Sequence, residues 1–296
     1  MSLASSLAGD VAGAFLKDMP GISPGVYEER DFRAVAEIVR HEAGIVLPPG
    51  KAMLVYSRLS PLVRATGLGT FSAFIDFIRN HPEERRKAVC ALTTNHTFFY
   101  REAHHFEHFA HEVRPWLINE LRAQHGVRLW SAGSSSGEEV FSLVMTFLGP
   151  DRNEGRNLAR TDVRILASDI ADHALAKASQ GQYELKDTQG LPEPLRNAWT
   201  SVNGQTVTIA PEARELVQFK RLNLHGEWPM RRRFQVIFCR NVMIYFDQPT
   251  KERLVARFAD QLVPGGYLYI GHSERVSGPA EDALEPVGPT IYRRRG

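Results

Sequence analysis

The sequence predicts an α/β protein in which a parallel sheet follows a small all-helical domain and carries an antiparallel β insertion. Three observations support this class. Apolar residues recur at helical spacing from about Asp31 to Leu92, whereas strand-like and helix-like runs alternate after Gly126. Alternating strands and helices form parallel sheets. Between two of these runs, "SVNGQTVTIA" has an Asn-Gly pair flanked by β-branched residues, which indicates a tight hairpin.

The helical domain begins at "DFRAVAEIVRHEAG", where Asp31 is predicted to cap a helix that ends at Gly44. Thr70 is the expected cap of a later helix, "TFSAFIDFIRN". Pro61 should kink or break the second helix, because proline has no N–H and crowds the preceding turn. The helices after the first are expected at about 51–65, 70–80 and 82–92.

The alternating part follows a long amphipathic helix predicted from about Glu102 to Gln124. Its expected strands lie in "VRLWSAG", "VRILASD", "LVQFKRLN", "FQVIFCR" and "YLYIGHS". We therefore expect a flexible leader at 1–25, a helical domain at 26–92, a linker with the long helix at 93–126, and a domain at 127–296 with the β insertion at about 198–218.

Composition excludes several functional classes. The chain has 296 residues, of which 43% are hydrophobic and 24% charged, as in globular proteins of two domains. Its net charge of +2 gives no reason to expect nucleic-acid binding. There is no basic signal segment and no long uncharged apolar run, so a cytoplasmic location is expected. Cys90 and Cys239 stand apart and are predicted to be reduced packing residues.

Ligands of parallel sheets bind at the carboxyl ends of the strands. The loop after the first predicted strand reads "AGSSSGEEVF" and opens its helix with Glu138 and Glu139, which would repel a phosphate and suit a cation. S-adenosylmethionine (SAM) is such a ligand, since it carries an ammonium and a sulfonium. Asp169 follows the second strand, where an acidic side chain binds ribose hydroxyls. Two alternatives stay open: the glutamates could only be favourable helix N-terminal charges, and Asp169 could only cap the next helix.

At these positions the sequence resembles a known family. "TTNHTFFYRE", "WSAGSSSGEEVFSL", "LASDI", "LNL" and "FCRNVMIYFD" are similar to the successive motifs of the chemotaxis receptor glutamate methyltransferases, the CheR family. The resemblance extends from about residue 28 to 293. It implies a class I SAM-dependent methyltransferase fold with a helical N-terminal domain and an inserted β-subdomain. It also implies methyl transfer from SAM to chemoreceptor glutamates, which leaves S-adenosylhomocysteine and forms methyl esters for sensory adaptation.

The resemblance further implies a set of site residues. The stretch from Thr93 to Phe106 would fold over the methyl donor and its aromatic residues would seal the pocket. Arg101 and Tyr245 would be the catalytic residues, with Tyr245 beside the transferred methyl. The implied donor-binding residues are Asn95, Thr97, Arg101, Glu139, Asp169, Asn223, Leu224, Arg240 and Asn241.

The sequence departs from the family pattern in the helical domain. The second helix, which in the family is basic and faces the receptor, keeps Lys51, Arg58 and Arg64 but has Ser60-Pro61 where more basic sequence is usual.

The short "VNGQ" turn lacks the longer glycine-containing loop of relatives that grip a tethering peptide, so no dependence on a receptor C-terminal pentapeptide is expected. We also expect a monomer. No metal is expected, because His104, His108 and His111 share one helix face that is exposed and has no indicated carboxylate partner.

Two other functions remain compatible with the sequence. One is a SAM-dependent methyltransferase for a different acceptor, such as a small molecule. The other is a non-enzymatic module that senses SAM and binds signalling proteins through the helical domain. A glutamate acceptor would need no general base, because its carboxylate, with a pKa of about 4.3, is already ionised at neutral pH.

Overall fold

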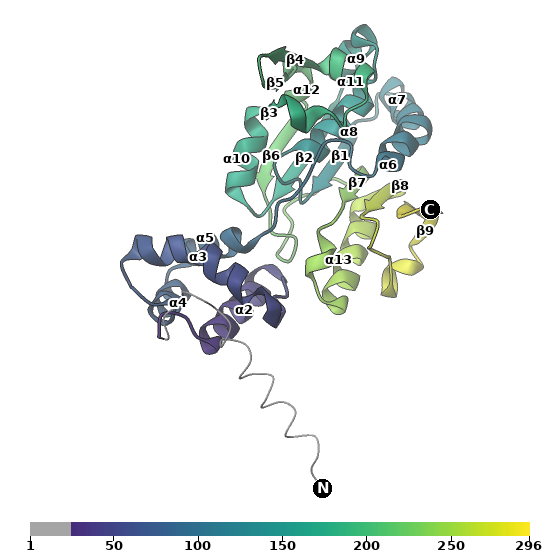
Figure 1. Ribbon diagram of the computed structural model, residues 1–296. Helices are drawn as coiled ribbons and strands as arrows, with labels where there is room; N and C mark the ends of the chain where they lie inside the picture. The colour runs from purple at the N-terminus through teal and green to yellow at the C-terminus, as the bar shows by residue number, and fades with distance from the viewer. Residues whose placement is uncertain (1–24) are drawn as a thin grey trace. The chain divides into compact units, whose positions relative to one another are not determined.

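The computed structural model describes residues 25–296 (Figure 1). The chain divides between Thr94 and Asn95 into two compact units. The leader expected at 1–25 lies outside the described residues, apart from Gly25. None of the described helices is long and apolar enough to cross a membrane.

The first unit consists of helices around an apolar centre. Val55, Leu59, Phe71 and Phe74 are almost completely buried there. The ring of Tyr27 lies 4.5 Å from that of Phe71, centroid to centroid. The α-helices are α2 (Glu29–Ala43), α3 (Ala52–Thr66), α4 (Phe71–Asn80) and α5 (Pro82–Leu92), with a 3₁₀ turn, Pro49–Lys51, before α3.

The ends of these helices confirm most of the local predictions. Gly44 ends α2 in the left-handed conformation at φ 72°, and Thr70 caps α4 by accepting a hydrogen bond from the Ala73 N–H at 3.2 Å. The cap prediction for Asp31 was wrong by three positions. Glu28 is the N-cap of α2, and Asp31 completes a reciprocal capping box by accepting from the Glu28 N–H at 2.8 Å.

Helix α3 continues through Pro61, so the helix is not broken there. The hydroxyl of Ser60 donates to the Tyr56 carbonyl, one turn earlier, at 2.6 Å. Arg58, one of the basic residues of α3, donates to the carbonyls of Leu92 and Thr93, where α5 ends. Its guanidinium therefore stabilises the C-terminus of α5.

The second unit is built on a seven-stranded sheet with the order β6-β2-β1-β7-β8-β10-β9 (Figure 1). The pairs β6-β2, β2-β1, β1-β7 and β7-β8 are parallel, and β10 is antiparallel to both of its neighbours. The strands are β1 (Val127–Ala132), β2 (Val163–Asp169), β6 (Val217–Arg221), β7 (Phe234–Cys239), β8 (Leu262–Ile270), β9 (Leu284–Gly288) and β10 (Ile291–Arg294).

Helices cover this sheet and explain why its central strands are apolar throughout. All six residues of β7 are buried, the pattern of a strand covered on both faces. Helix α10 packs against β2 and β6, and α13 packs against β8. The helices between the strands are α8 (Glu138–Leu148), α9 (Arg152–Ala159), α10 (Asp172–Gln180), α11 (Glu193–Trp199), α12 (Pro211–Arg214) and α13 (Gln248–Gln261).

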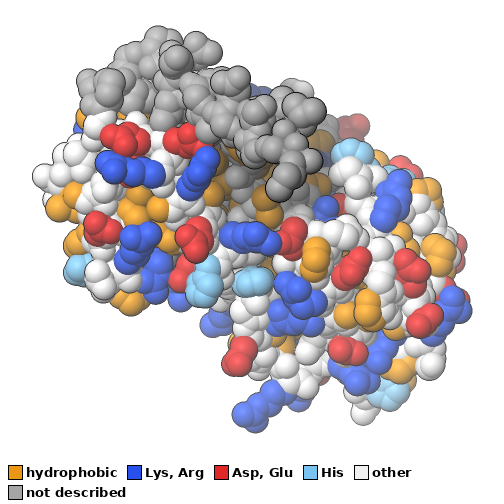
Figure 2. All heavy atoms as spheres, turned by 90° about the horizontal axis from the view of Figure 1, so that it is seen from below, with side chains coloured by type: hydrophobic (Ala, Val, Ile, Leu, Met, Phe, Trp, Pro, Cys, Tyr) orange, Lys and Arg blue, Asp and Glu red, His pale blue; other side chains and the backbone are white. Residues whose placement is uncertain are grey.

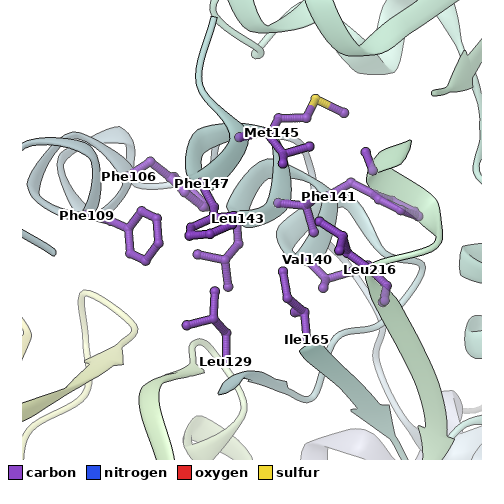
Figure 3. Close-up of a cluster of buried hydrophobic side chains, with 14 of the residues drawn as sticks. Phe106, Phe109, Leu129, Val140, Phe141, Leu143, Met145, Phe147, Ile165 and Leu216 are labelled. Atoms are coloured by element: carbon purple, nitrogen blue, oxygen red, sulfur yellow. The ribbon is translucent and has the colours of Figure 1, made fainter. Parts of the chain in front are cut away.

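The core of the second unit joins the sheet to α8. Leu129 and Ile165 of the strands lie below Phe141 and Leu143 of α8 in Figure 3, and all four side chains are fully buried. Burial of each such side chain contributes about 1.5–3 kcal/mol relative to exposure. Because the core fixes α8 on the sheet, it also fixes the loop that precedes α8.

The predicted long helix is present but contains three segments. They are α6 (Ala103–His108), a π-helical turn (Phe109–Val113) and α7 (Arg114–Arg122). Pro115 follows the π-helical turn, and its missing N–H is a physical reason for the changed hydrogen-bonding pattern there. Cys239 is buried in β7, and Cys90 is buried in α5.

The antiparallel insertion is a separate three-stranded sheet with the order β3-β5-β4 (Figure 1). The hairpin predicted at Asn203-Gly204 connects β4 (Thr200–Asn203) to β5 (Thr206–Ile209) through a turn with Gly204 at φ 60°. The third strand, β3 (Gln182–Glu184), lies before the expected range of 198–218, and β6 of the main sheet begins at Val217. Three residues are too few to show an alternating pattern, so β3 left no sequence signal.

Candidate active site

The loop after β1 is tightly folded against the end of β2. The N–H groups of Gly133 and Ser134 donate to the Ser168 carbonyl at 2.8 and 2.9 Å. Gly133 has φ 82°, and a Cβ there would lie 2.4 Å from a methyl of Val242. Gly137 has φ 97°, and a Cβ there would lie 2.7 Å from the Tyr183 hydroxyl. Both glycines are therefore required by conformation and by space.

Asp169 lies at the carboxyl end of β2 and holds this loop. Its Oδ2 accepts from the Ser135 N–H at 2.8 Å, and its Oδ1 accepts from the Ala171 N–H at 2.9 Å. Burial raises the pKa of Asp169, while the backbone N–H groups oppose that shift. Ala171, not Asp169, is the N-cap of α10, so the alternative reading of Asp169 as a helix cap was wrong. The Ile170 N–H also contributes to holding this carboxylate.

The two glutamates that open α8 are both engaged in the interior. Glu139 Oε1 accepts from the Ser131 hydroxyl at 2.7 Å, and its Oε2 lies 3.5 Å from Arg240. Burial raises the pKa of Glu139, and the nearby Arg240 opposes that shift. Glu138 accepts from the Ser136 hydroxyl at 2.7 Å. Both also lie in the first turn of α8, where the alternative reading as favourable helix N-terminal charges places them.

The segment that enters the second unit lies along the same loop. The Asn95 carbonyl accepts from the Ser135 hydroxyl at 2.8 Å, and the Tyr100 N–H donates to Ser142 of α8 at 2.9 Å. The Arg101 carbonyl accepts from Arg240. Thr97, which lies between Asn95 and Arg101 in the sequence, has a half-buried side chain. The backbone of Asn95 and that of Arg101 are thus held at the loops that follow β1 and β7.

The aromatic residues of this segment have different environments. Phe98 is 47% exposed, and the Arg101 guanidinium lies 5.5 Å from its ring centre. Phe99 is buried against Tyr183, and Tyr100 stacks on Phe106 at 4.7 Å. Two of the three rings therefore pack in the core, and only Phe98 is available at the surface to cover a ligand.

Arg240 and Asn241 follow β7 and complete a buried charge cluster. Arg240 lies 3.5 Å from Glu139 and 3.5 Å from Glu102, and its side chain is almost fully buried. Asn241 adopts φ 59°, and its side-chain amide donates to Glu102 at 3.3 Å. Tyr245 ends a 3₁₀ turn, Met243–Tyr245, in the same loop and is half-buried.

Asn223 and Leu224 follow β6, the neighbour of β2. The Leu222 N–H donates to the Asp169 carbonyl at 3.0 Å, which places them beside Asp169. Leu224 is buried, and its carbonyl accepts from Arg257 of α13 at 2.9 Å. Asn223 Oδ1 accepts from the His225 N–H at 3.0 Å.

Sequence reasoning missed Glu102 and Glu274. Glu102 has φ 58° and accepts hydrogen bonds from His272 and Asn241. Glu274 accepts from the N–H groups of Gly271 and Asn241. Glu102 is the final residue of "TTNHTFFYRE", and that motif gives it no separate role. No local pattern predicts that Glu274 contacts a loop that follows another strand.

Two of the three histidines on the predicted helix face, His104 and His108, have other partners. His108 Nδ1 lies 2.8 Å from the Tyr269 hydroxyl, and His104 Nε2 lies 3.3 Å from the Pro289 carbonyl. Across residues 25–296 no group of three or more His, Cys, Asp or Glu side chains is arranged to hold a metal ion.

The strand order, the antiparallel β10 and the acidic residues at the ends of β1 and β2 define the class I SAM-dependent methyltransferases. The residues at these strand ends fit SAM, since carboxylates follow the strands and the sequence of the loop after β1 has no phosphate-binding glycine motif. In addition, Ser134 Oγ in the loop after β1 is a buried polar atom without a hydrogen-bond partner among the described residues.

Comparison with known proteins gives the family. Residues 95–292 match the SAM-binding domain of CheR methyltransferases, and residues 30–93 match the CheR all-alpha domain. The chain belongs to the CheR methyltransferase family. It is 41% identical to a probable chemotaxis protein methyltransferase of Rhizobium etli, over 86% of this chain and 96% of that protein. It is 38% identical to chemotaxis protein methyltransferase 2 of Pseudomonas aeruginosa, over 90% of this chain and 93% of that protein.

Proposed function

We propose that this protein transfers the methyl group of SAM to glutamate side chains in the cytoplasmic signalling domains of chemoreceptors. Membership of the CheR family supports a SAM-dependent methyltransferase of chemotaxis, and the relatives carry that name. The observation that carries the proposal is a pair of carboxylates beyond two adjacent strands: Asp169 is buried, and the side chain of Glu139 is 12% exposed. These suit a nucleoside cation and would repel a phosphate.

The roles of the donor-binding residues are part of the proposal. Asp169 accepts hydrogen bonds from the ribose hydroxyls, and Asn223 and Leu224 flank the adenine next to it. Glu139 holds the positively charged part of the donor, with Arg240 fixing its carboxylate from 3.5 Å. Asn95 and Thr97 approach from the segment that lies along the loop after β1, and Asn241 completes the site from the loop after β7.

The reaction balances without a proton transfer. One oxygen of the glutamate carboxylate forms a bond to the methyl carbon, the carbon–sulfur bond breaks, and the sulfur keeps the electron pair. An anion and a cation become a neutral ester and a neutral sulfide. Holding oxygen, carbon and sulfur in line is then the main task of the site. We assign that task to Arg101, which orients the carboxylate, and to Tyr245, which donates a hydrogen bond beside the methyl.

A second part of the proposal concerns the β insertion. Its hairpin turns within two residues at Gly204 and Gln205. A turn of that length leaves no loop to grip a peptide. We therefore propose that methylation does not depend on a pentapeptide at the receptor C-terminus.

The test is incubation with SAM labelled in the methyl group and membranes that contain the organism's own chemoreceptors. The proposal expects label in receptor peptides, on glutamate, released as methanol by mild base because esters hydrolyse. Asp169→Ala serves as the control in which donor binding is weakened. Label that resists base, or label only in small molecules, would indicate another acceptor. Tight donor binding without any transfer would indicate a SAM-sensing module.

A further inference from the structure

Glu274 is a buried carboxylate that organises backbone. It is 4% exposed and lies in the turn after β8. Its Oε2 accepts from the N–H groups of Gly271 at 2.6 Å and Asn241 at 3.3 Å, and its Oε1 accepts from the Ile244 N–H at 3.2 Å. Among residues 25–296 no Lys or Arg forms an ion pair with it, so its partners are peptide groups.

The turn and the loop after β7 also fit together sterically. A Cβ at Gly271 would lie 2.7 Å from the Asn241 nitrogen and 3.0 Å from Glu274 Oε2. Asn241 itself adopts φ 59°, a left-handed conformation that asparagine tolerates better than most residues with a side chain. The contacts of Glu274 and the absence of a side chain at Gly271 therefore hold the start of this loop in place.

Only a carboxylate satisfies this arrangement. Its partners, with Met243 in addition to the three above, are all backbone N–H donors, and a carboxylate presents acceptors on both oxygens. Glutamine would place its NH₂ group against at least one N–H, while aspartate would keep the charge on a side chain shorter by one methylene. Tyr245 follows Ile244 directly, so a displacement of the Ile244 backbone also displaces the Tyr245 hydroxyl.

We propose that Glu274 is a positioning residue for methyl transfer. By fixing the N–H groups of Asn241 and Ile244 it sets the path of the loop that carries Tyr245. This inference rests on the proposed role of Tyr245 beside the methyl. It assigns to Glu274 an effect on the rate of transfer at saturating donor, separate from a change in donor affinity that acts through Asn241.

The test is a double-mutant cycle in the intact protein. Single-turnover transfer to the receptor is measured at saturating SAM for wild type, Glu274→Gln, Tyr245→Phe and the double variant, and calorimetry gives each affinity for S-adenosylhomocysteine. We expect Glu274→Gln to slow transfer by about ten- to a hundredfold, because small displacements of reacting groups have effects of that size. In the Tyr245→Phe background the same change should slow transfer by less than about threefold. Glu281→Gln, an exposed carboxylate in the next turn, should match wild type.

The outcomes distinguish a failure of the proposed role of Tyr245 from a failure of the positioning role of Glu274. If Tyr245→Phe transfers at the wild-type rate, the proposed role of Tyr245 is wrong. If Tyr245→Phe is slow while Glu274→Gln matches wild type, or while the two effects simply multiply, Glu274 does not act through Tyr245 and the inference is overturned. Should Glu274→Gln fail to fold, Glu274→Asp takes its place in the cycle, since it keeps the charge, and the same comparison decides.

Discussion

Asp169 and Glu139 show what a single residue contributes to this site. Both could be predicted from sequence, because a residue that follows a predicted strand lies at the sheet edge where ligands bind. Their hydrogen bonds to Ser135 and Ser131 could not be predicted. Those hydrogen bonds depend on the conformation of each loop relative to the strand ends, which the pattern of neighbouring residues in the sequence does not predict.

The first prediction concerns donor binding. Asp169→Ala should lose about 1.5–3 kcal/mol of affinity for S-adenosylhomocysteine, because charge-assisted hydrogen bonds to the ribose are lost. Titration calorimetry measures the change, and Asp172→Ala, at the exposed start of α10, is the control. A folded Asp169→Ala protein with wild-type affinity would remove Asp169 from the site.

The second prediction concerns His105, which is fully buried beside the charge cluster. The pKa of His105 is lowered to about 3, chiefly by burial. The positive charge of Arg240 and the neighbouring His104 also lower this pKa, whereas the negative charge of Glu102 raises it. In the unfolded chain its pKa is near 6.5, so as the pH falls the unfolded state takes up the proton first. The stability that neutral His105 contributes above pH 6.5 is therefore lost as the pH falls toward 3.

The measurement is the free energy of unfolding in urea at pH 7.5 and 5.5. Between these values His105 should account for a loss of about 1.4 kcal/mol. His105→Gln should show a pH dependence smaller by that amount. An identical pH dependence in the variant would mean that His105 is protonated to the same extent in the folded and unfolded states.

At the scale of elements, regular helices and strands were predictable and irregular ones were not. The helices at 70–80 and 82–92 repeat their apolar residues long enough to reveal a period, and the strand "FQVIFCR" is a continuous apolar run of strand length. The three-residue β3 and the π-helical turn before Pro115 have no such period. The loops after β1 and β7 are held by contacts between distant parts of the chain, so their conformations could not be read from the sequence.

The third prediction tests the loop after β1. Gly133→Ala should weaken donor binding at least tenfold, because the added methyl would meet Val242 of the loop after β7 as well as strain φ. Gly204→Ala is the matched control. Gly204 also has positive φ, but nothing lies within 4 Å of its Cβ position, so it should lose about 1–2 kcal/mol of stability and keep donor affinity. Equal donor affinity in both variants would contradict a role for the loop in the site.

At the scale of the whole molecule, every residue assigned to the site belongs to the second unit. The helical unit contributes other features, including the basic residues of α3. Lys51 and Arg64 are exposed, whereas Arg58 is occupied with the end of α5. On the face drawn in Figure 2 basic and acidic side chains are interspersed, in keeping with the net charge of +2.

The fourth prediction concerns recruitment to the receptor. Because the hairpin turns at Gly204 and Gln205, deletion of the last five residues of a receptor should leave its rate of methylation within about twofold. Fluorescence anisotropy with a labelled C-terminal pentapeptide provides a second measurement. Binding at micromolar concentration would show that the insertion does hold such a peptide.

The central claim is that the acceptor is a carboxylate that needs no general base. The most direct test is the pH dependence of single-turnover transfer to the receptor at saturating SAM. The rate should rise only where the acceptor ionises, near pH 4–5, and stay nearly constant from about pH 6.5 to 8.5. Tyr245→Phe should lower this plateau without adding an ionisation. A wild-type rate that climbs about tenfold per pH unit through neutrality would contradict the claim, and His96 or His272 would then be the residues to test as the base.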